Sequence, residues 1–158
     1  MLKIIGSMMI ISAGTFFSHT LCTSQRKKLS TTDALIDFTE YIRSSIYTSR
    51  QPLLDIYASF KDTRLSECGF IFQLNQNGIR SAINIVSKDV TERSFSSLEN
   101  LAENLGGINT ETQLKLCEET SKLLREELKK QEDMYSKKEK MYKTLPLLMA
   151  SSIIIMMI

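Results

Sequence analysis

Two long segments without charged residues, one at each end of the chain, constrain the fold more than any other feature. Residues 4–22 contain no Asp, Glu, Lys or Arg, and neither do residues 145–158. A helix that crosses the roughly 30 Å hydrocarbon core of a bilayer needs about 20 apolar residues at 1.5 Å each. The first segment is long enough, and the second is long enough when it is counted from Lys140. We therefore expect transmembrane helices over residues 1–24 and 140–158.

Each of these segments has an alternative interpretation. A cleaved signal peptide carries its positive charge before the apolar core, whereas the cluster Arg26-Lys27-Lys28 follows it here. A lipoprotein signal places a small residue before its cysteine, but the bulky Leu21 precedes Cys22. The alternative for the C-terminal segment is an amphipathic or re-entrant tail. Its final run IIIMMI has no polar face, which argues against a tail that lies flat on the membrane. The sequence favours two retained membrane helices.

The basic residues near the apolar segments predict the orientation of the chain in a membrane. They lie on the inner sides of these segments, with Lys3 alone outside: Arg26, Lys27, Lys28, Lys137, Lys138, Lys140 and Lys143. Lysines near a helix end extend their ammonium groups to the headgroups, and Tyr142 suits the interface. The positive-inside rule then places residues 25–139 in the cytosol, as a domain tethered to the cell membrane by two spans. Membrane lipid is the first expected partner.

The central segment has apolar residues at helical spacing, and no stretch of it alternates like a strand. Residues 30–33 offer N-caps for a first helix, in which Leu35, Phe38, Ile42, Ile46 and Tyr47 form one apolar stripe. Pro52 suits the first turn of a second helix. Further helices are predicted over residues 66–74, 79–86, 95–105 and 109–145, with a turn at residues 75–78. We expect an all-α fold: a small helical bundle between two transmembrane helices, with a long final helix that runs into the membrane.

Residue types that catalyse reactions or bind metals are scarce. The single histidine, His19, lies in the first apolar segment, and no glycine-rich phosphate loop is present. The three cysteines have neither zinc-site nor disulfide spacing, which fits a reducing compartment, and we expect Cys68 and Cys117 on the cytosolic side. Basic residues are not interleaved with aromatic ones on a face, which argues against nucleic acid. The sequence predicts a protein that is not an enzyme and has no cofactor or metal.

Three stretches together resemble one known family. They are SSIYTSRQPLLDIYASF, ENLAENLGGINTETQ and KEKMYKTLPLL, in this order along the chain. Through them the chain is similar to stage III sporulation protein AB over essentially its whole length, apolar ends included. The positions that match the family's motifs are Ile46, Tyr47, Pro52, Leu53, Asp55, Leu105, Gly106, Asn109, Gln113, Tyr142 and Lys143.

Most of the matching positions suggest structural roles. Gly106 is predicted to end a helix with positive φ, and Asn109 to cap the next helix. Gln113 is either an interface contact or a buried polar tie between two helices. The sequence departs from the family pattern at Gln51, where threonine is usual, and at Asn109, where aspartate is usual. Pro146 and Ala150 stand where the family has glycines that allow close packing of the last helix.

The resemblance also implies a function. The family belongs to a membrane complex of endospore-forming bacteria that is thought to form a channel between the mother cell and the forespore. This chain would be the non-catalytic platform subunit, in the mother-cell membrane around the forespore. It would be an oligomer within the complex, beside other subunits and a cytosolic ATPase. The alternatives are a platform protein of another secretion or pilus system and a membrane-tethered helical adaptor.

Overall fold

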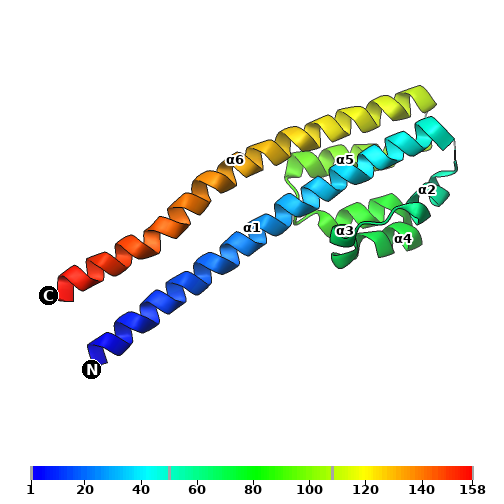
Figure 1. Cartoon of the computed structure of the whole chain (residues 1–158). Coiled ribbons are helices and arrows are strands. Elements are labelled where there is room, and N and C mark those ends of the chain that lie inside the picture. The colour runs from blue at the N-terminus through cyan, green and yellow to red at the C-terminus, as the bar shows by residue number, and fades with distance from the viewer. Residues whose placement is uncertain (1, 50, 108, 158) are drawn as a thin grey trace. The chain divides into compact units, whose positions relative to one another are not determined.

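The computed structural model describes residues 2–49, 51–107 and 109–157, and most of these residues are helical. Side chains are described for residues 23–48, 51–107 and 109–137. The helices in chain order are α1 (Leu2–Ser49), α2 (Leu53–Ser59), α3 (Thr63–Glu67), α4 (Phe70–Val86), α5 (Glu92–Asn104) and α6 (Thr110–Met157) (Figure 1). The described residues contain no strand. The all-α prediction is confirmed.

The chain divides into two compact units. One unit combines residues 1–27 with residues 131–158, and within it Arg26 Nε donates a hydrogen bond to Tyr135 Oη at 3.0 Å. The other unit is Lys28–Lys130, which lies inside the domain predicted over residues 25–139. Among the described residues, no helix is long and apolar enough to cross a membrane. Residues 1–22 and 138–158, which make up nearly all of the two predicted transmembrane segments, lie outside the described side chains.

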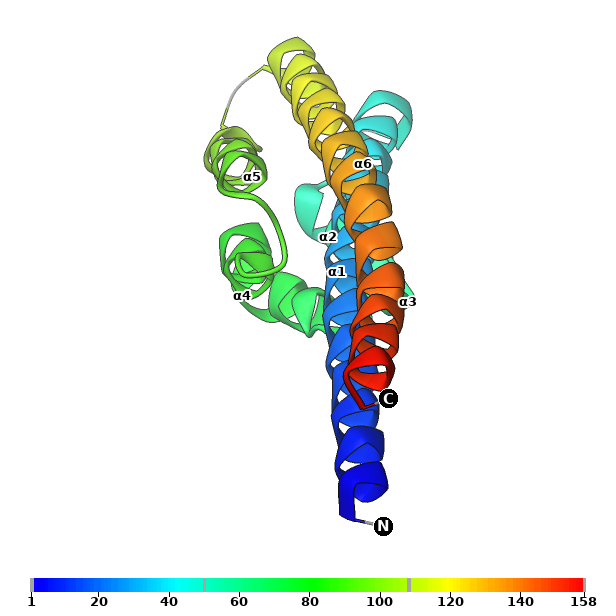
Figure 2. The same cartoon turned by 90° about the vertical axis from the view of Figure 1, so that its left-hand side faces the viewer.

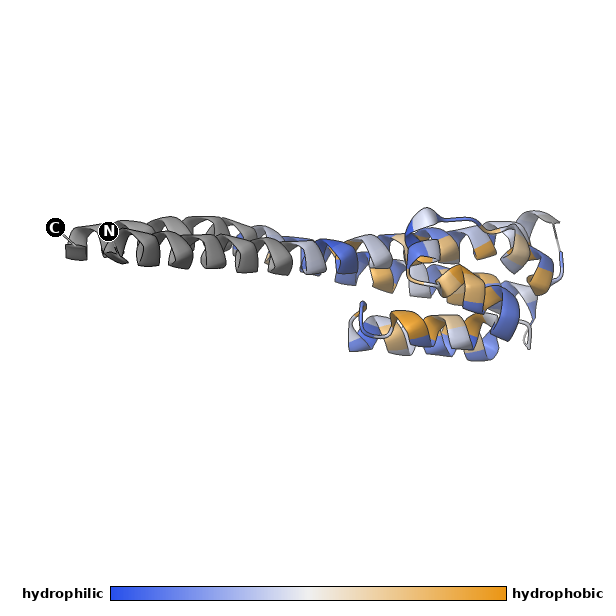
Figure 3. Ribbon diagram, turned by 90° about the horizontal axis from the view of Figure 1, so that it is seen from below, coloured by the Kyte–Doolittle hydropathy of each residue, from blue (hydrophilic) through white to orange (hydrophobic). Residues whose placement is uncertain are grey.

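The core of the Lys28–Lys130 unit is built around the aromatic ring of Phe38 on α1. Its centroid lies 5.0 Å from that of Phe60 and 5.2 Å from that of Phe70, both edge-on, and 6.4 Å from that of Tyr57. Such pairs add about 0.5–1.5 kcal/mol each to the free energy of burial. The helices of this unit carry hydrophobic and hydrophilic stripes, as expected of helices with one buried face (Figure 3). Phe38 therefore joins α1 to the segments that follow it.

The antiparallel pair of α1 and α6 forms one side of this unit, with α4 and α5 on the other (Figure 2). Arg43 Nη2 on α1 donates to Glu118 Oε2 on α6 at 3.0 Å. Further along, Glu40 Oε1 accepts from Ser121 Oγ at 3.0 Å and also from Arg125. These contacts pair residues that are at least 75 positions apart in the chain, so they fix the tertiary register of the two helices.

Three predicted features differ from the structure. The expected caps at residues 30–33 lie inside the continuous α1, where Thr32 Oγ1 donates to the Lys28 carbonyl at 3.0 Å. A hydroxyl that bonds the carbonyl four residues back no longer caps a helix start. The helix predicted over residues 66–74 is instead split at Gly69, which has φ of 82°. The predicted turn at residues 75–78 is a kink within α4, where Gly78 has φ of 80° and ψ of 178°.

Candidate interaction site

A hollow of about 380 Å³ lies in the Lys28–Lys130 unit, where α1 ends and α6 begins. Its lining residues come from α1, from the start of α2, from the α5–α6 connection and from the first turn of α6: Ile46, Gln51, Pro52, Leu53, Gly106, Thr110 and Gln113. Five of these seven are motif positions from the sequence, and they come from two stretches that lie far apart in the chain. We call this feature the motif hollow.

Pro52 forms one wall of the motif hollow and starts α2. Its φ of −56° and ψ of 143° end the extended connection, and its carbonyl accepts from the Asp55 amide at 3.0 Å and the Ile56 amide at 3.3 Å. The helix begins at Leu53, so the predicted start is confirmed. Asp55 lies in the first turn, where a carboxylate interacts favourably with the helix dipole.

Gly106 also lines the motif hollow, and two features of its surroundings require a glycine. Its φ is +88°, a conformation that residues with a side chain rarely adopt. A Cβ atom at this position would also lie only 3.0 Å from Leu53 Cδ1. Leu105, the residue before it, ends α5 and donates its amide to the Leu101 carbonyl at 2.9 Å. The predicted helix end with positive φ is confirmed.

Asn109 starts α6 beside the hollow. Its Oδ1 accepts from the Thr112 amide at 2.8 Å, and its carbonyl accepts from the Gln113 amide at 3.0 Å. This is the predicted helix cap, made without the charge that an aspartate would bring. The first turn of α6 then places the half-buried Gln113 in the lining of the hollow.

Two large apolar side chains near the motif hollow are exposed to solvent. Tyr47 is 78% exposed and Leu54 is 74% exposed. The sequence predicted Tyr47 as part of the buried stripe of α1, which is wrong: Leu35, Phe38, Ile42 and Ile46 are buried, and Tyr47 lies off that stripe by one position. Sequence reasoning missed Leu54, although the buried pair Ile56 and Tyr57 places residue 54 on the outer face of α2. The other two motif positions, Tyr142 and Lys143, lie outside the described side chains.

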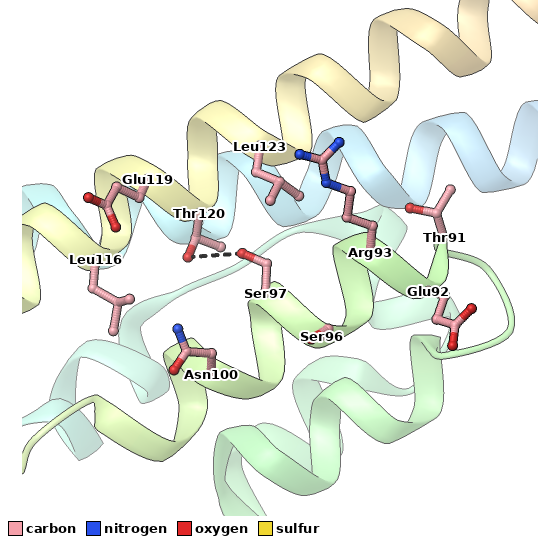
Figure 4. A pocket seen from close by; sticks show the side chains of 10 residues that line it. All are labelled: Thr91, Glu92, Arg93, Ser96, Ser97, Asn100, Leu116, Glu119, Thr120 and Leu123. Carbon is pink, nitrogen blue, oxygen red and sulfur yellow. Dashed lines mark hydrogen bonds between the residues drawn. The ribbon is translucent and has the colours of Figure 1, made fainter.

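A second, larger hollow lies between α5 and α6 in the same unit, and we call it the α5–α6 groove (Figure 4). It measures about 900 Å³ and is lined mainly by polar side chains: Thr91, Glu92, Arg93, Ser96, Ser97, Asn100, Leu116, Glu119, Thr120 and Leu123. Ser97 Oγ donates across it to Thr120 Oγ1 at 3.4 Å. Arg93 reaches from α5 to Glu127 on α6 at 3.4 Å. No motif position lines this groove.

Acidic residues of α1 form ion pairs with arginines of other helices, at positions that line neither hollow. Arg64 on α3 contacts Asp33 and Asp37 on α1, each at 2.6 Å, and its own helix cap Asp62 at 2.8 Å. Partial burial raises the pKa of Asp62, but the bonds from Arg64 and the Leu65 amide lower it further, to below its usual range. The hydrogen bond from Arg125 likewise lowers the pKa of Glu40.

The cysteine environments differ from those of reactive thiols. Cys117 is fully buried, and burial raises the pKa of its thiol to about 11. The half-buried Cys68 donates to the Leu65 carbonyl at 3.2 Å. Within the described side chains, no group of His, Cys, Asp or Glu is arranged to hold a metal ion. Thiolate chemistry is therefore suppressed at Cys117, because the thiolate is the nucleophilic form.

The family model of stage III sporulation protein AB matches residues 3–158 of the chain. This match extends over both apolar ends and the whole Lys28–Lys130 unit. Neither the curated proteins nor the solved structures include a match.

Proposed function

The chain belongs to the stage III sporulation protein AB family, which gives it a role in sporulation, and from this premise we propose that it is a platform subunit of a membrane complex. In this proposal the chain has no catalytic activity. It is a scaffold in the channel complex that joins mother cell and forespore, and it is required for spore development. A platform protein of another secretion or pilus system is the second candidate.

The observation that supports a scaffold role is the motif hollow. Positions from two separate family stretches line it, and the exposed Tyr47 and Leu54 are the chain neighbours of its lining residues Ile46 and Leu53. Exposed apolar side chains beside a concave site are typical of protein–protein contacts. We infer that this end of the unit contacts another subunit of the complex, of which a cytosolic ATPase is the leading candidate.

The proposal includes two membrane spans, over residues 1–24 and 140–158, with the Lys28–Lys130 unit in the mother-cell cytosol. It is supported by the length of the uncharged segments and by the basic residues on their inner sides. Within the Lys28–Lys130 unit, α1 runs from residue 28 to the hollow at Ile46, and α6 runs from the hollow at Gln113 to residue 130. With both ends of the chain in a membrane, the motif hollow is then available to a cytosolic partner.

Complementation of a deletion strain tests this function. We expect the deletion to arrest spore development and the unchanged gene to restore heat-resistant spores. The double variant Tyr47→Ser/Leu54→Ser should reach normal protein levels but restore few spores, because it keeps the buried core and loses the exposed contact. Phe72→Ser is the matched control, since Phe72 is 61% exposed on α4 and lies outside the hollow.

The outcomes separate the candidates. Normal spores in the deletion strain, with a defect in secretion or pili, would favour the second candidate over the sporulation channel. Full activity of the double variant would exclude the motif hollow as the contact. A photo-crosslinker placed at position 54 then identifies the subunit that binds there, and an ATPase in the product supports the proposed partner.

A further inference from the structure

We propose that the basic residues that follow the first apolar segment and precede the second bind the phosphate headgroups of anionic phospholipids. The residues are Arg26, Lys27, Lys28, Lys137, Lys138, Lys140 and Lys143, and we call them the basic collar. This inference rests on the membrane attachment in the proposed function and adds to it a ligand class and a set of ligand-binding residues.

The charge of the chain is strongly asymmetric along its length. Residues 26–28 and 137–143 contain seven basic residues and one acidic residue, a net charge of +6. Residues 29–136 contain 12 basic and 17 acidic residues, a net charge of −5. The overall charge of +2 conceals this separation. An anionic surface therefore attracts the collar and repels the rest of the domain.

The structure brings Arg26 of the first basic run close to the start of the second. Arg26 on α1 and Tyr135 on α6 belong to the same compact unit, and the guanidinium Nε donates to the phenol oxygen at 3.0 Å. This bond places Arg26 beside the part of α6 that carries Lys137, two residues after Tyr135. Arg26, Lys27 and Lys137 are all exposed to solvent. Residues 110 positions apart in the chain thus present charge from neighbouring helices.

The chemistry of the collar fits lipid phosphates. Clusters of four to eight Lys and Arg residues next to a membrane helix are typical of sites for anionic lipids. The arginine binds a phosphate through two parallel N–H groups, whereas the lysines act as point charges on flexible stems. The collar also directly adjoins the apolar segments, where the headgroups of surrounding lipids lie. A set of charges at this level meets lipid phosphates at high local concentration.

The test uses the full chain in neutral detergent, with lipid binding measured by native mass spectrometry. The probes are dioleoyl phosphatidylglycerol, which is anionic, and dioleoyl phosphatidylcholine, which has no net charge. We expect at least tenfold tighter binding of phosphatidylglycerol at 0.05 M salt. The preference should nearly vanish at 1 M salt, where the Debye length is about 3 Å.

A triple variant locates the binding site. Each basic residue near an anionic surface contributes about fivefold to affinity, so R26Q/K27Q/K137Q should lose up to roughly 100-fold in binding of phosphatidylglycerol. The control is K115Q/K122Q/K129Q, which removes the same charge from three exposed lysines of α6 outside the collar. The control variant should keep the preference for phosphatidylglycerol.

The conservative variant Y135F tests the contact between Arg26 and α6. It keeps the ring and removes the oxygen that accepts from Arg26, so we expect a two- to threefold loss of phosphatidylglycerol binding with unchanged helix content. If the triple variant does not fold, Y135F and the salt series of the unchanged chain still test whether the basic collar binds phosphatidylglycerol.

Two failures are distinguishable. Equal affinity for both lipids would contradict lipid binding by the collar, and so would a loss of phosphatidylglycerol binding in the control variant as large as in the triple variant. Neither result would affect the proposed membrane attachment. Release of the chain from membranes by alkaline carbonate instead overturns the proposed membrane attachment itself.

Discussion

The motif hollow and the α5–α6 groove are built in different ways. The smaller hollow depends on backbone geometry, with the extended Pro52, the left-handed Gly106 and the helix cap Asn109 at its edges. The larger groove depends on side chains, since Ser97, Thr120 and Asn100 line it from regular helices. The family positions line the smaller of the two. If the proposed function holds, the smaller hollow is the functional surface, and its backbone geometry marks it better than its size, because few residues satisfy that geometry.

The substitution Gly106→Ala has the largest expected effect on this comparison. It forces an L-residue into φ of +88° and places a Cβ atom 3.0 Å from Leu53 Cδ1. We expect a loss of about 2–3 kcal/mol in the free energy of unfolding, or roughly 5–10 °C in Tm. Thermal unfolding of the purified chain, followed by circular dichroism, measures it.

Gly107→Ala is the matched control, because a Cβ at that position meets no atom within 4 Å and φ there is outside the left-handed region. It should shift the free energy of unfolding by less than about 1 kcal/mol. Equal effects of the two substitutions would show that the hollow does not depend on the geometry of Gly106.

The next largest effect is expected at the cap of α6. Asn109→Ala leaves the Thr112 amide without its acceptor, which should cost about 1 kcal/mol of stability. Asn109→Asp keeps the acceptor and adds a negative charge at the helix start, so it should be neutral or stabilising by a few tenths of a kcal/mol. A chemical denaturation series on the three chains compares them. Greater loss in the Asp variant than in the Ala variant would contradict the assigned role of the side chain.

Acid should lower the stability of the domain by protonating carboxylates that line neither hollow, Asp62 and Glu40. The pKa values of Asp62 and Glu40 are lowered in the folded chain, so their contribution to stability is complete above the pKa of the unfolded carboxyls. It is lost as the pH falls from about 4 through the lower folded values. Arg64→Gln removes the guanidinium that lowers the pKa of Asp62, so Tm should fall less steeply with pH on the acid side. An unchanged pH profile in this variant would exclude the Arg64 cluster as its source.

The smallest effect is expected in the α5–α6 groove. Ser97→Ala removes a hydroxyl whose hydrogen bond to Thr120 is long, at 3.4 Å, and partly exposed. We expect a change of less than about 0.5 kcal/mol in stability and no change in spore formation. A sporulation defect in this variant at normal protein level would reverse the comparison and make the groove the functional surface.

Local backbone chemistry was predictable from the sequence. Pro52 has a fixed φ, a glycine pair tolerates left-handed φ, and an Asn side chain reaches an amide three residues ahead, so each role depends on neighbours in the chain. The helical class followed from the spacing of apolar residues for the same reason. The prediction for Tyr47 was wrong because the buried face of α1 is narrow. Ile46 lies on that face, and the next residue along a helix points about 100° away from it.

What only the tertiary structure decided is which of these local features meet. The sequence by itself determined the helical class, the cap at Asn109, the helix end at Gly106 and the separation of charge along the chain. It did not determine that Gly106 would contact Leu53, that Arg26 would bond Tyr135, or that α1 would continue through residues 30–33. These depend on contacts between residues 50 to 110 positions apart, whose free energy comes from burial and packing of whole helices rather than from the preferences of any single residue.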